Sequence, residues 1–305
     1  MKNGIFRNIL YCTIAAGMYL YCINASPKWL QAELKEYVFC CPAEIGIAVV
    51  TDTKDTICVN AESSYPMNSV MKLYQAMAVA ATLQAQGRGL DSLLPIKQEE
   101  LHPKTYSPMR KDYPSGDFQL SIARLLKYSL QESDNNACDI LFRHVVGIEA
   151  TEKYIQSLGI KNFAIRVNER DMYENNAASY KNWNLPLSAA LLINKLFTEP
   201  LYDSVYQNFL KETLISCTTG KNRLAKPLVS RGGIIGHKTG TGFNSLMGLP
   251  QGINDVGFVR LPNGRHYAIA VFIRSAFRDM HGTEQIIADI SEIVYKHIMI
   301  ESLWR

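Results

Sequence analysis

The sequence predicts an α+β fold, in which N- and C-terminal segments form one antiparallel sheet flanked by helices and an all-helical lobe is inserted between them. Strand patterns occur near both ends of the 305-residue chain, and helical patterns fill the long middle part. With 47% hydrophobic residues, the chain can bury a full core without metals or disulfides. We divide it into a sheet lobe, residues 26–65 and 215–305, and a helical lobe, residues 66–214.

Each lobe is predicted from its own periodicity. The sheet lobe starts with a helix over 29–39, where Pro27 suits the helix start, and ends with a helix from about 283 to 299. Its strands are predicted at residues 45–50, 56–59, 234–238, 256–261 and 266–273. The clearest amphipathic helices of the other lobe are predicted at residues 120–130, 137–146 and 187–197.

The N-terminus is typical of an export signal. Lys2 and Arg7 precede an apolar run, residues 9–23, and Ala25 offers a small residue for cleavage. The run is shorter than the roughly 20 residues that span a bilayer, which favours a removed signal peptide, residues 1–25, over a retained anchor. We therefore expect an exported, periplasmic protein without membrane contact after signal removal.

Cysteine positions offer one alternative to a soluble exported form. Lipoprotein anchoring would use Cys12 or Cys22, but Tyr11 and Tyr21 stand where a small residue is expected. Removal of the signal leaves five of the seven cysteines, so at least one thiol is unpaired within the chain. The sequence has no Cys-x-x-Cys, His-Glu-x-x-His or His-x-His, so we expect no metal site.

Charge excludes a further class of partner. The formal net charge is +4, and no basic run has the length expected for a nucleic-acid face. We expect a small-molecule substrate, no nucleic acid, and a monomer.

Three short motifs occur in a fixed order: Ser69-Val70-Met71-Lys72, then Ser133-Asp134-Asn135, then Lys238-Thr239-Gly240. A Ser-x-x-Lys alone carries little information, since about one is expected by chance in a chain this long. All three in order have a chance probability of roughly one in a thousand or less. The combination therefore indicates one site.

The first motif suits nucleophilic catalysis. Residues three apart share one helix face, so the Lys72 amine can reach the Ser69 hydroxyl and accept its proton once it has lost its own. Pro66 suits a helix that begins near Asn68, which would place Ser69 at the positive end of the helix dipole. The alternative is an ordinary surface helix.

The other two motifs suit a turn and a strand. Ser133-Asp134-Asn135 interrupts a helical pattern, either as a functional turn or as a plain loop in which Asp134 or Asn135 caps the next helix. Lys238 and Gly240 lie on one face of a strand, where Gly240 leaves room for a substrate along the sheet edge. Lys238 supplies positive charge, and Thr239 and Thr241 supply hydroxyls, for a carboxylate-bearing substrate; a lysine-protected edge strand is the alternative.

This trio resembles the motifs of serine β-lactamases and penicillin-binding enzymes, and the resemblance covers nearly the whole mature chain. It implies a β-lactamase/transpeptidase-like fold in which Ser69 is acylated, Ser133 shuttles a proton to the leaving nitrogen, and Asn135 binds the substrate amide. It also implies an oxyanion hole formed by the amides of Ser69 and Thr241. Tyr106 matches the aromatic residue at the rim of the class A site.

A loop further along resembles one branch of class A. Residues 167–172 look like the Ω-loop of PER-type and CfxA-type enzymes, and Tyr180-Lys181-Asn182-Trp183 resembles a second motif of that branch. The resemblance makes Glu169 the general base for deacylation, with Asp171 or Glu174 as alternatives. Tyr173 departs from the asparagine or histidine usual at its position.

The resemblance implies hydrolysis of β-lactam antibiotics through a serine acyl-enzyme, with a lean toward cephalosporins and no metal or organic cofactor. Arg223 is the candidate support for the substrate carboxylate. Ala76 and Leu126 stand where many class A enzymes have a disulfide. Two alternatives remain: a penicillin-binding D,D-peptidase with slow deacylation, and a sensor domain that captures β-lactams covalently.

Overall fold

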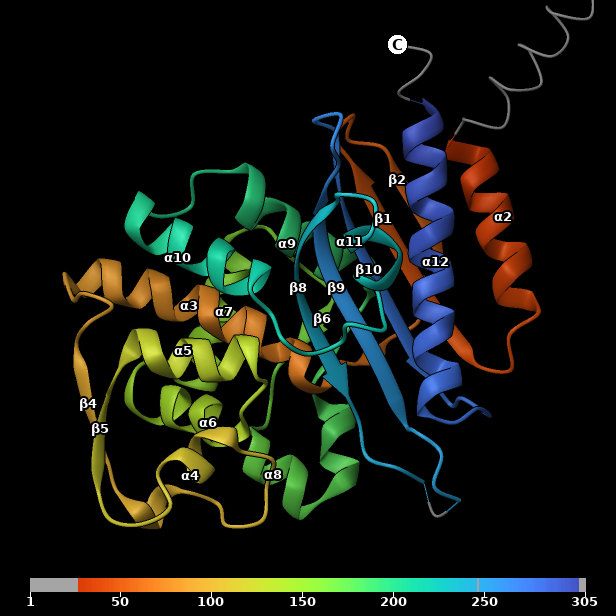
Figure 1. Ribbon diagram of the computed structural model, residues 1–305. Coiled ribbons are helices and arrows are strands. Elements are labelled where there is room, and N and C mark those ends of the chain that lie inside the picture. The colour runs from red at the N-terminus through yellow and green to blue at the C-terminus, as the bar shows by residue number, and fades with distance from the viewer. Residues whose placement is uncertain (1–26, 246, 302–305) are drawn as a thin grey trace, which may run out of the picture.

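A five-stranded antiparallel sheet separates two groups of helices in the computed structural model, which describes residues 27–245 and 247–301 (Figure 1). The strand order is β2-β1-β10-β9-β8. The strands are β1 (Glu44–Thr51), β2 (Thr56–Val59), β8 (Ile234–Thr241), β9 (Gly252–Arg260) and β10 (His266–Arg274). The sheet joins the two ends of the chain, which confirms the predicted fold class. The expected signal peptide, residues 1–25, lies outside the described residues.

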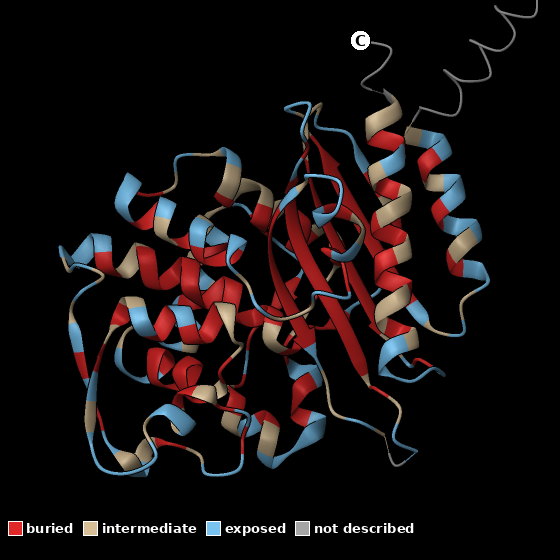
Figure 2. Cartoon of the chain, in the orientation of Figure 1, coloured by how far each residue is buried: buried red, intermediate tan, exposed pale blue. Residues whose placement is uncertain are grey.

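Both faces of the sheet are buried, as Figure 2 shows by the red strands. Helices α2 (Pro27–Phe39) and α12 (Met280–Glu301) cover one face and lie side by side in Figure 1. Along β1, Ile47 and Val49 belong to the core beneath these helices, whereas Ala48 and Val50 belong to the core on the other side. Alternate residues of a strand point to opposite faces, so an all-apolar strand serves two cores.

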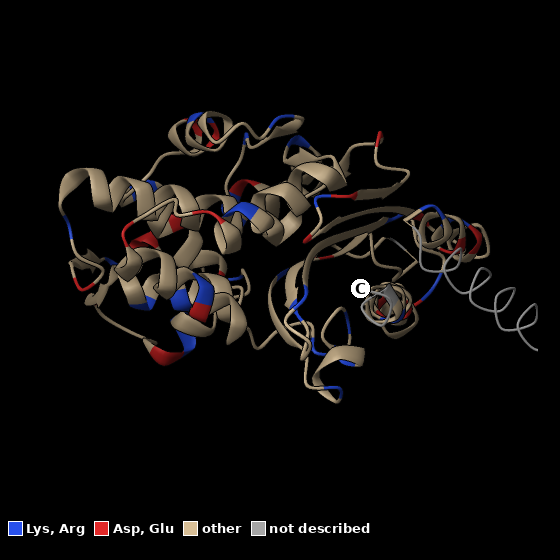
Figure 3. Cartoon of the chain, turned by 90° about the horizontal axis from the view of Figure 1, so that it is seen from above, with Lys and Arg blue, Asp and Glu red and all other residues tan. Residues whose placement is uncertain are grey.

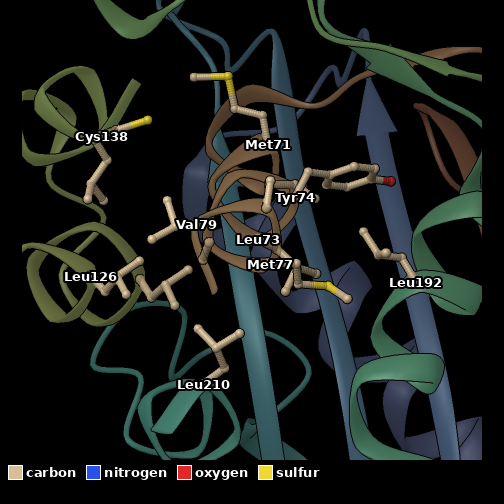
Figure 4. Close-up of a cluster of buried hydrophobic side chains, with 14 of the residues drawn as sticks. Met71, Leu73, Tyr74, Met77, Val79, Leu126, Cys138, Leu192 and Leu210 are labelled. Carbon is tan, nitrogen blue, oxygen red and sulfur yellow. The ribbon is translucent and has the colours of Figure 1, made fainter. Parts of the chain in front are cut away.

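The helical lobe packs on the other face of the sheet. Its helices are α3 (Met71–Gln86), α4 (Pro108–Asp112), α5 (Ile122–Gln131), α6 (Asn135–His144), α7 (Ile148–Ser157), α8 (Glu169–Glu174), α9 (Pro186–Thr198) and α10 (Ser204–Ile215). The first ten residues of helix α3 are all buried, and the helix lies between Leu126 of α5 and Leu192 of α9 (Figure 4). A helix that is apolar all round suits such a central place. Its first residue directly follows the short 3-10 helix η1 (Asn68–Val70), which carries Ser69.

The inserted lobe is not all-helical, which corrects the prediction. Strand β4 (Leu93–Ile96) pairs with β5 (Phe118–Ser121), and three two-residue strands form a small sheet: β3 (Tyr65–Pro66), β6 (Phe163–Ala164) and β7 (Trp183–Asn184). Strands this short show too few alternations to be detected in a sequence. Shorter helical segments complete the chain: η2 (Gln98–Glu100), η3 (Asn176–Lys181) and α11 (Lys226–Val229). The lobe boundaries at 65/66 and 214/215 stay a prediction.

The surface carries mixed charge. Lysine and arginine are interspersed with aspartate and glutamate over the helices in Figure 3. None of the described helices is long and apolar enough to cross a membrane. The five cysteines of the described ranges, Cys40, Cys41, Cys58, Cys138 and Cys217, are all free thiols.

Asn182 ties the loop before α8 to the segment that leads into α3. Its side-chain oxygen accepts hydrogen bonds from the amides of Arg166 (2.7 Å) and Val167 (3.1 Å), and its side-chain nitrogen donates to the Val167 carbonyl (2.9 Å). Its own carbonyl accepts from the Met67 amide at 2.9 Å. The buried side chain of Asn182 therefore positions the loop before α8, and its backbone carbonyl positions the segment that leads into α3.

Replacing this asparagine leaves two amides without an acceptor. We expect Asn182→Ala to lower the free energy of unfolding by about 2–4 kcal/mol, because each unsatisfied buried group costs about 1–3 kcal/mol. Tyr180→Ala, at an exposed position of the same loop, should change it by less than about 0.5 kcal/mol. Urea unfolding measures both, and equal stabilities would contradict this role.

Candidate active site

The ammonium group of Lys72 lies at the centre of the predicted residues. Its Nζ donates to Ser69 Oγ (2.9 Å) and Asn135 Oδ1 (2.7 Å), and it forms an ion pair with Glu169 Oε1 at 2.9 Å. It also donates to the Ser133 carbonyl at 2.8 Å. Lys72 is fully buried, so these partners replace its hydration.

The start of α3 explains the first of these contacts. Ser69 lies on η1 and Lys72 on the first turn of α3, so their separation of three residues places both side chains on one face. Ser69 Oγ also contacts Glu169 Oε1 at 3.3 Å. The nucleophile candidate therefore has a basic group on each of two sides.

The second motif is both a turn and a helix cap. Ser133 has a positive φ of 59°, and the Asp134 side chain caps α6 by accepting from the Ala137 amide at 2.8 Å. The same carboxylate accepts from Ser107 Oγ (2.8 Å) and the Met109 amide (2.7 Å). Asp134 thereby fixes the segment that carries Tyr106. The motif forms a turn at the site and also caps α6, so the two alternatives given by the sequence are compatible.

Glu169 is the first residue of α8. The amides of Glu169 and Arg170 each donate to the Asp139 carboxylate at 2.9 Å. Burial and the charge of Glu169 raise the pKa of Asp139 to about 7. Asp171 instead closes a capping box with Asn168. Of the acidic residues considered from the sequence, the structure brings Glu169 to Ser69.

Glu174, the other alternative, is exposed at the end of α8. Tyr173 lines the cleft, and its ring lies 4.7 Å, centroid to centroid, from that of His102. The unusual residue of the Ω-loop is therefore packed against an aromatic partner that the sequence did not indicate.

Strand β8 carries the third motif. Lys238 Nζ donates to Ser133 Oγ (3.0 Å) and to the Thr239 carbonyl (2.9 Å). Desolvation, followed by the charge of Lys72, lowers the pKa of Lys238 to about 7. At Gly240 a Cβ atom would lie 2.6 Å from the Met67 carbonyl oxygen. The backbone at Met67 lies so close to β8 that only glycine fits at position 240. The sequence had instead suggested that this glycine leaves room for the substrate.

Arg223 supports β8 from beside the cleft. Its guanidinium donates to Thr241 Oγ1 (2.8 Å) and the Gly240 carbonyl (3.1 Å), and pairs with Glu284 (3.0 Å). The predicted carboxylate-supporting arginine thus contacts the residue expected to bind that carboxylate.

These groups surround a cleft of about 430 Å³. The predicted residues that line it are Ser69, Tyr106, Ser133, Asn135, Glu169, Arg223, Thr239 and Thr241. Tyr106 is 56% exposed, as a rim residue should be. Lys72 and Lys238 lie buried beneath the cleft, within reach of Ser133 from two sides.

Asn254 of β9 is a further site residue, which the sequence analysis missed. Its side-chain nitrogen donates to the carbonyls of Pro66 (2.8 Å) and Met67 (3.2 Å), just before Ser69. The available signal was a polar pair, Asn254-Asp255, inside an otherwise apolar strand.

Comparison with known proteins gives the family. Residues 29–298 match the model of the β-lactamase enzyme family. A β-lactamase of Phocaeicola vulgatus is 40% identical over 276 residues, 90% of this chain and 86% of the relative. The extended-spectrum β-lactamase PER-1 of Pseudomonas aeruginosa is 32% identical, over 90% and 88% of the two chains.

A solved class A β-lactamase from Bacteroides cellulosilyticus superimposes with a TM-score of 0.85 at 34% identity, covering 90% of this chain and 98% of that one. The chain belongs to the class A β-lactamases. The resemblance stated from the motifs, including the PER-type branch, is confirmed. In this β-lactamase the three motifs and the Ω-loop glutamate meet in one cleft.

The lowered pKa of Lys238 predicts a pH dependence. As pH rises through about 7, Lys238 in the free enzyme loses its charge and attracts a substrate carboxylate less. We expect kcat/KM for a carboxylate-bearing β-lactam to fall above that pH, because kcat/KM reports the ionisation of the free enzyme. Lys238→Arg keeps its charge and should remove this alkaline fall. A wild-type profile that is flat from pH 6 to 9 would argue against it.

Proposed function

We propose that this β-lactamase opens the β-lactam ring through an acyl-enzyme on Ser69, which Glu169 then releases with water. One observation carries the proposal: Lys72 Nζ lies 2.9 Å from both Ser69 Oγ and Glu169 Oε1. A nucleophile, its proton acceptor and a second base are thus in direct contact, which is the arrangement that acyl transfer to and from a serine needs.

Acylation starts with proton transfer from Ser69. Within the ion pair, a proton can move from Lys72 to Glu169, which leaves both groups neutral. The neutral Lys72 amine then accepts the Ser69 proton. Ser69 Oγ then attacks the ring carbonyl. We assign the oxyanion hole to the amides of Ser69 and Thr241, as the family resemblance implies.

Ring opening requires a proton on the leaving nitrogen. Ser133 Oγ lies 3.4 Å from Lys72 Nζ and 3.0 Å from Lys238 Nζ. It can therefore donate its own proton to the nitrogen and recover one from a neighbouring ammonium group. We assign the substrate carboxylate to Lys238, Thr239 and Thr241. Asn135 binds the amide of the substrate's side chain, and Tyr106 lies at the rim of the cleft.

Deacylation uses the Glu169 carboxylate as general base. It removes a proton from water as that water attacks the ester, and Ser69 leaves with a proton from Lys72. General-base assistance is typically worth about 10²–10⁴ in rate. Tyr173 lies on the same helix, α8, and lines the same cleft as Glu169, so its side chain can alter the position of this water.

Cephalosporins are the proposed preferred substrates. A second hollow of about 280 Å³ shares Asn68, Gly242 and Phe243 with the active-site cleft and extends toward η3. It offers space for a bulky acylamino group. Two relatives, PER-1 and the solved TLA-1 enzyme, are named extended-spectrum β-lactamases.

Removing the deacylation base should trap the acyl-enzyme. In Glu169→Gln we expect a cephalosporin adduct on Ser69 that persists for minutes to hours in intact-protein mass spectrometry, because general-base assistance of about 10²–10⁴ is lost. Glu174→Gln, an exposed carboxylate of the same helix, should turn over like wild type. A wild-type adduct as long-lived as that of Glu169→Gln would indicate a D,D-peptidase instead.

Removing the nucleophile should abolish both steps. We expect Ser69→Ala to form no adduct and to lose hydrolysis of a chromogenic cephalosporin by at least about 10³-fold. Turnover by Ser69→Ala at the wild-type rate would reject the acyl-enzyme.

Substrate preference is measured with one penicillin and one bulky cephalosporin. We expect the higher kcat/KM for the cephalosporin. Phe243→Trp, which narrows the shared part of the two hollows, should reduce that value more than the value for the penicillin. A preference for the penicillin would overturn the cephalosporin assignment and leave the acyl-enzyme intact.

A further inference from the structure

Beside the active site lies a cluster of three side chains that hydrolysis does not use. The thiol of Cys217 lies near the imidazole of His237, whose Nδ1 lies 2.9 and 3.1 Å from the two carboxylate oxygens of Asp255. His237 and Asp255 are buried, whereas Cys217 is partly exposed. An imidazole held by a carboxylate and placed near a thiol is an arrangement that activates cysteine.

The charges of the cluster favour the thiolate. Burial lowers the pKa of His237, but Asp255 and the hydrogen bond to Cys217 outweigh it and raise that pKa to about 10. Burial raises the pKa of Cys217, but the hydrogen bond and charge of His237, with the charge of Lys238, lower it to about 7. At neutral pH a large fraction of Cys217 is therefore thiolate beside an imidazolium.

Two other cysteines provide a comparison within the chain. Cys41 and Cys58 are also partly exposed, but burial raises the pKa of each, and no imidazole appears among the groups that affect them. The activation of Cys217 is therefore a property of its neighbours and not of exposure.

The thiol lies next to Thr219, a residue that lines the active-site cleft. Its Sγ is 3.3 Å from Thr219 Oγ1, which is 2.7 Å from Thr239 Oγ1 of the substrate-binding strand. The carbonyls of Leu130 and Gln131, at the end of α5 and shortly before Ser133, are each 3.8 Å from Sγ. A bulky group attached to this sulfur would disturb these contacts with Thr219 or with the end of α5.

We propose that Cys217 is a modification site, at which an activated thiol exchanges with a low-molecular-weight disulfide and the resulting adduct lowers β-lactam hydrolysis. The thiolate sulfur attacks one sulfur of the disulfide, the disulfide bond breaks, and the other half leaves as a thiolate that takes a proton from solvent. Cys217 is oxidised to the mixed disulfide as that half is reduced, and excess thiol reverses the exchange.

Thiol reactivity is tested by timed iodoacetamide labelling at pH 7, followed by peptide mass spectrometry. Cys217 should react about five- to tenfold faster than Cys41 and Cys58, because its larger thiolate fraction exceeds its loss of intrinsic nucleophilicity. In denaturant the three rates should become similar. Equal rates in the folded protein would overturn the proposal.

The pH dependence of labelling separates activation from simple access. The charged groups that act on the thiol are His237 and Lys238 of β8, and Asp255 of β9 holds His237. In wild type the rate should level off above about pH 7, and in His237→Gln the midpoint should move upward by about one unit or more. Correct folding of the variant is checked by its unfolding transition. An unchanged midpoint would show that His237 does not activate the thiol.

The effect on activity is tested with oxidised glutathione. Treatment should lower kcat/KM by roughly tenfold or more in wild type, because small displacements in a site are costly, and dithiothreitol should restore it. Cys217→Ser should keep its basal turnover and lose the sensitivity, whereas Cys58→Ser should stay sensitive. Full modification of Cys217 without loss of activity would overturn the regulatory part.

This activity test rests on the proposed function, but the labelling test does not. If untreated protein hydrolysed no β-lactam, the proposed function would fail while the labelling rates still decided whether Cys217 is an activated site.

Discussion

The buried ammonium group of Lys72 is the constraint on which the rest of the site depends. A buried charge costs several kcal/mol unless oppositely charged or polar groups surround it. Here those groups come from three separate elements: the turn before α6, α6 itself and α8. The helical lobe must bring these elements to the first turn of α3, and the groups that it brings are those to which we assign acyl transfer.

A second layer of buried polar side chains holds those elements in place. Asp134 fixes the turn, Asp139 fixes the start of α8, and Asn182 fixes the loop before it. Asn254 holds the segment just before Ser69 from the side of the sheet. Each binds backbone groups of a segment that has no regular partner, so side chains replace the missing secondary-structure hydrogen bonds. The proposed catalytic residues owe their positions to these contacts more than to the short helices that carry them.

The sequence predicted the two-sided sheet and the motif residues, because both leave repeated signals. Apolar alternation identifies strands such as β1, and three motifs in order identify one site. It did not reveal Asp139 or Asn254, because a single polar residue that binds backbone has no spacing to recognise. Two-residue strands also leave no periodic pattern in the sequence. For Gly240 the residue was noted for substrate space, whereas the constraint is the Met67 carbonyl, which belongs to a segment more than a hundred residues away in sequence.

The order in which the chain supplies its strands also determines when the site can be completed. Strand β1 pairs with β10, and Glu44 lies opposite Arg274. The neighbour of β1 on this side is therefore the last strand of the chain. Lys238 lies on an edge strand whose sole neighbour in the sheet is β9. A nascent chain that has emerged only through α10 holds Ser69, Lys72 and Glu169 but lacks the strands on which their lobe packs. Contacts so distant in sequence form slowly, so the proposed site is complete only once nearly the whole chain is available to fold.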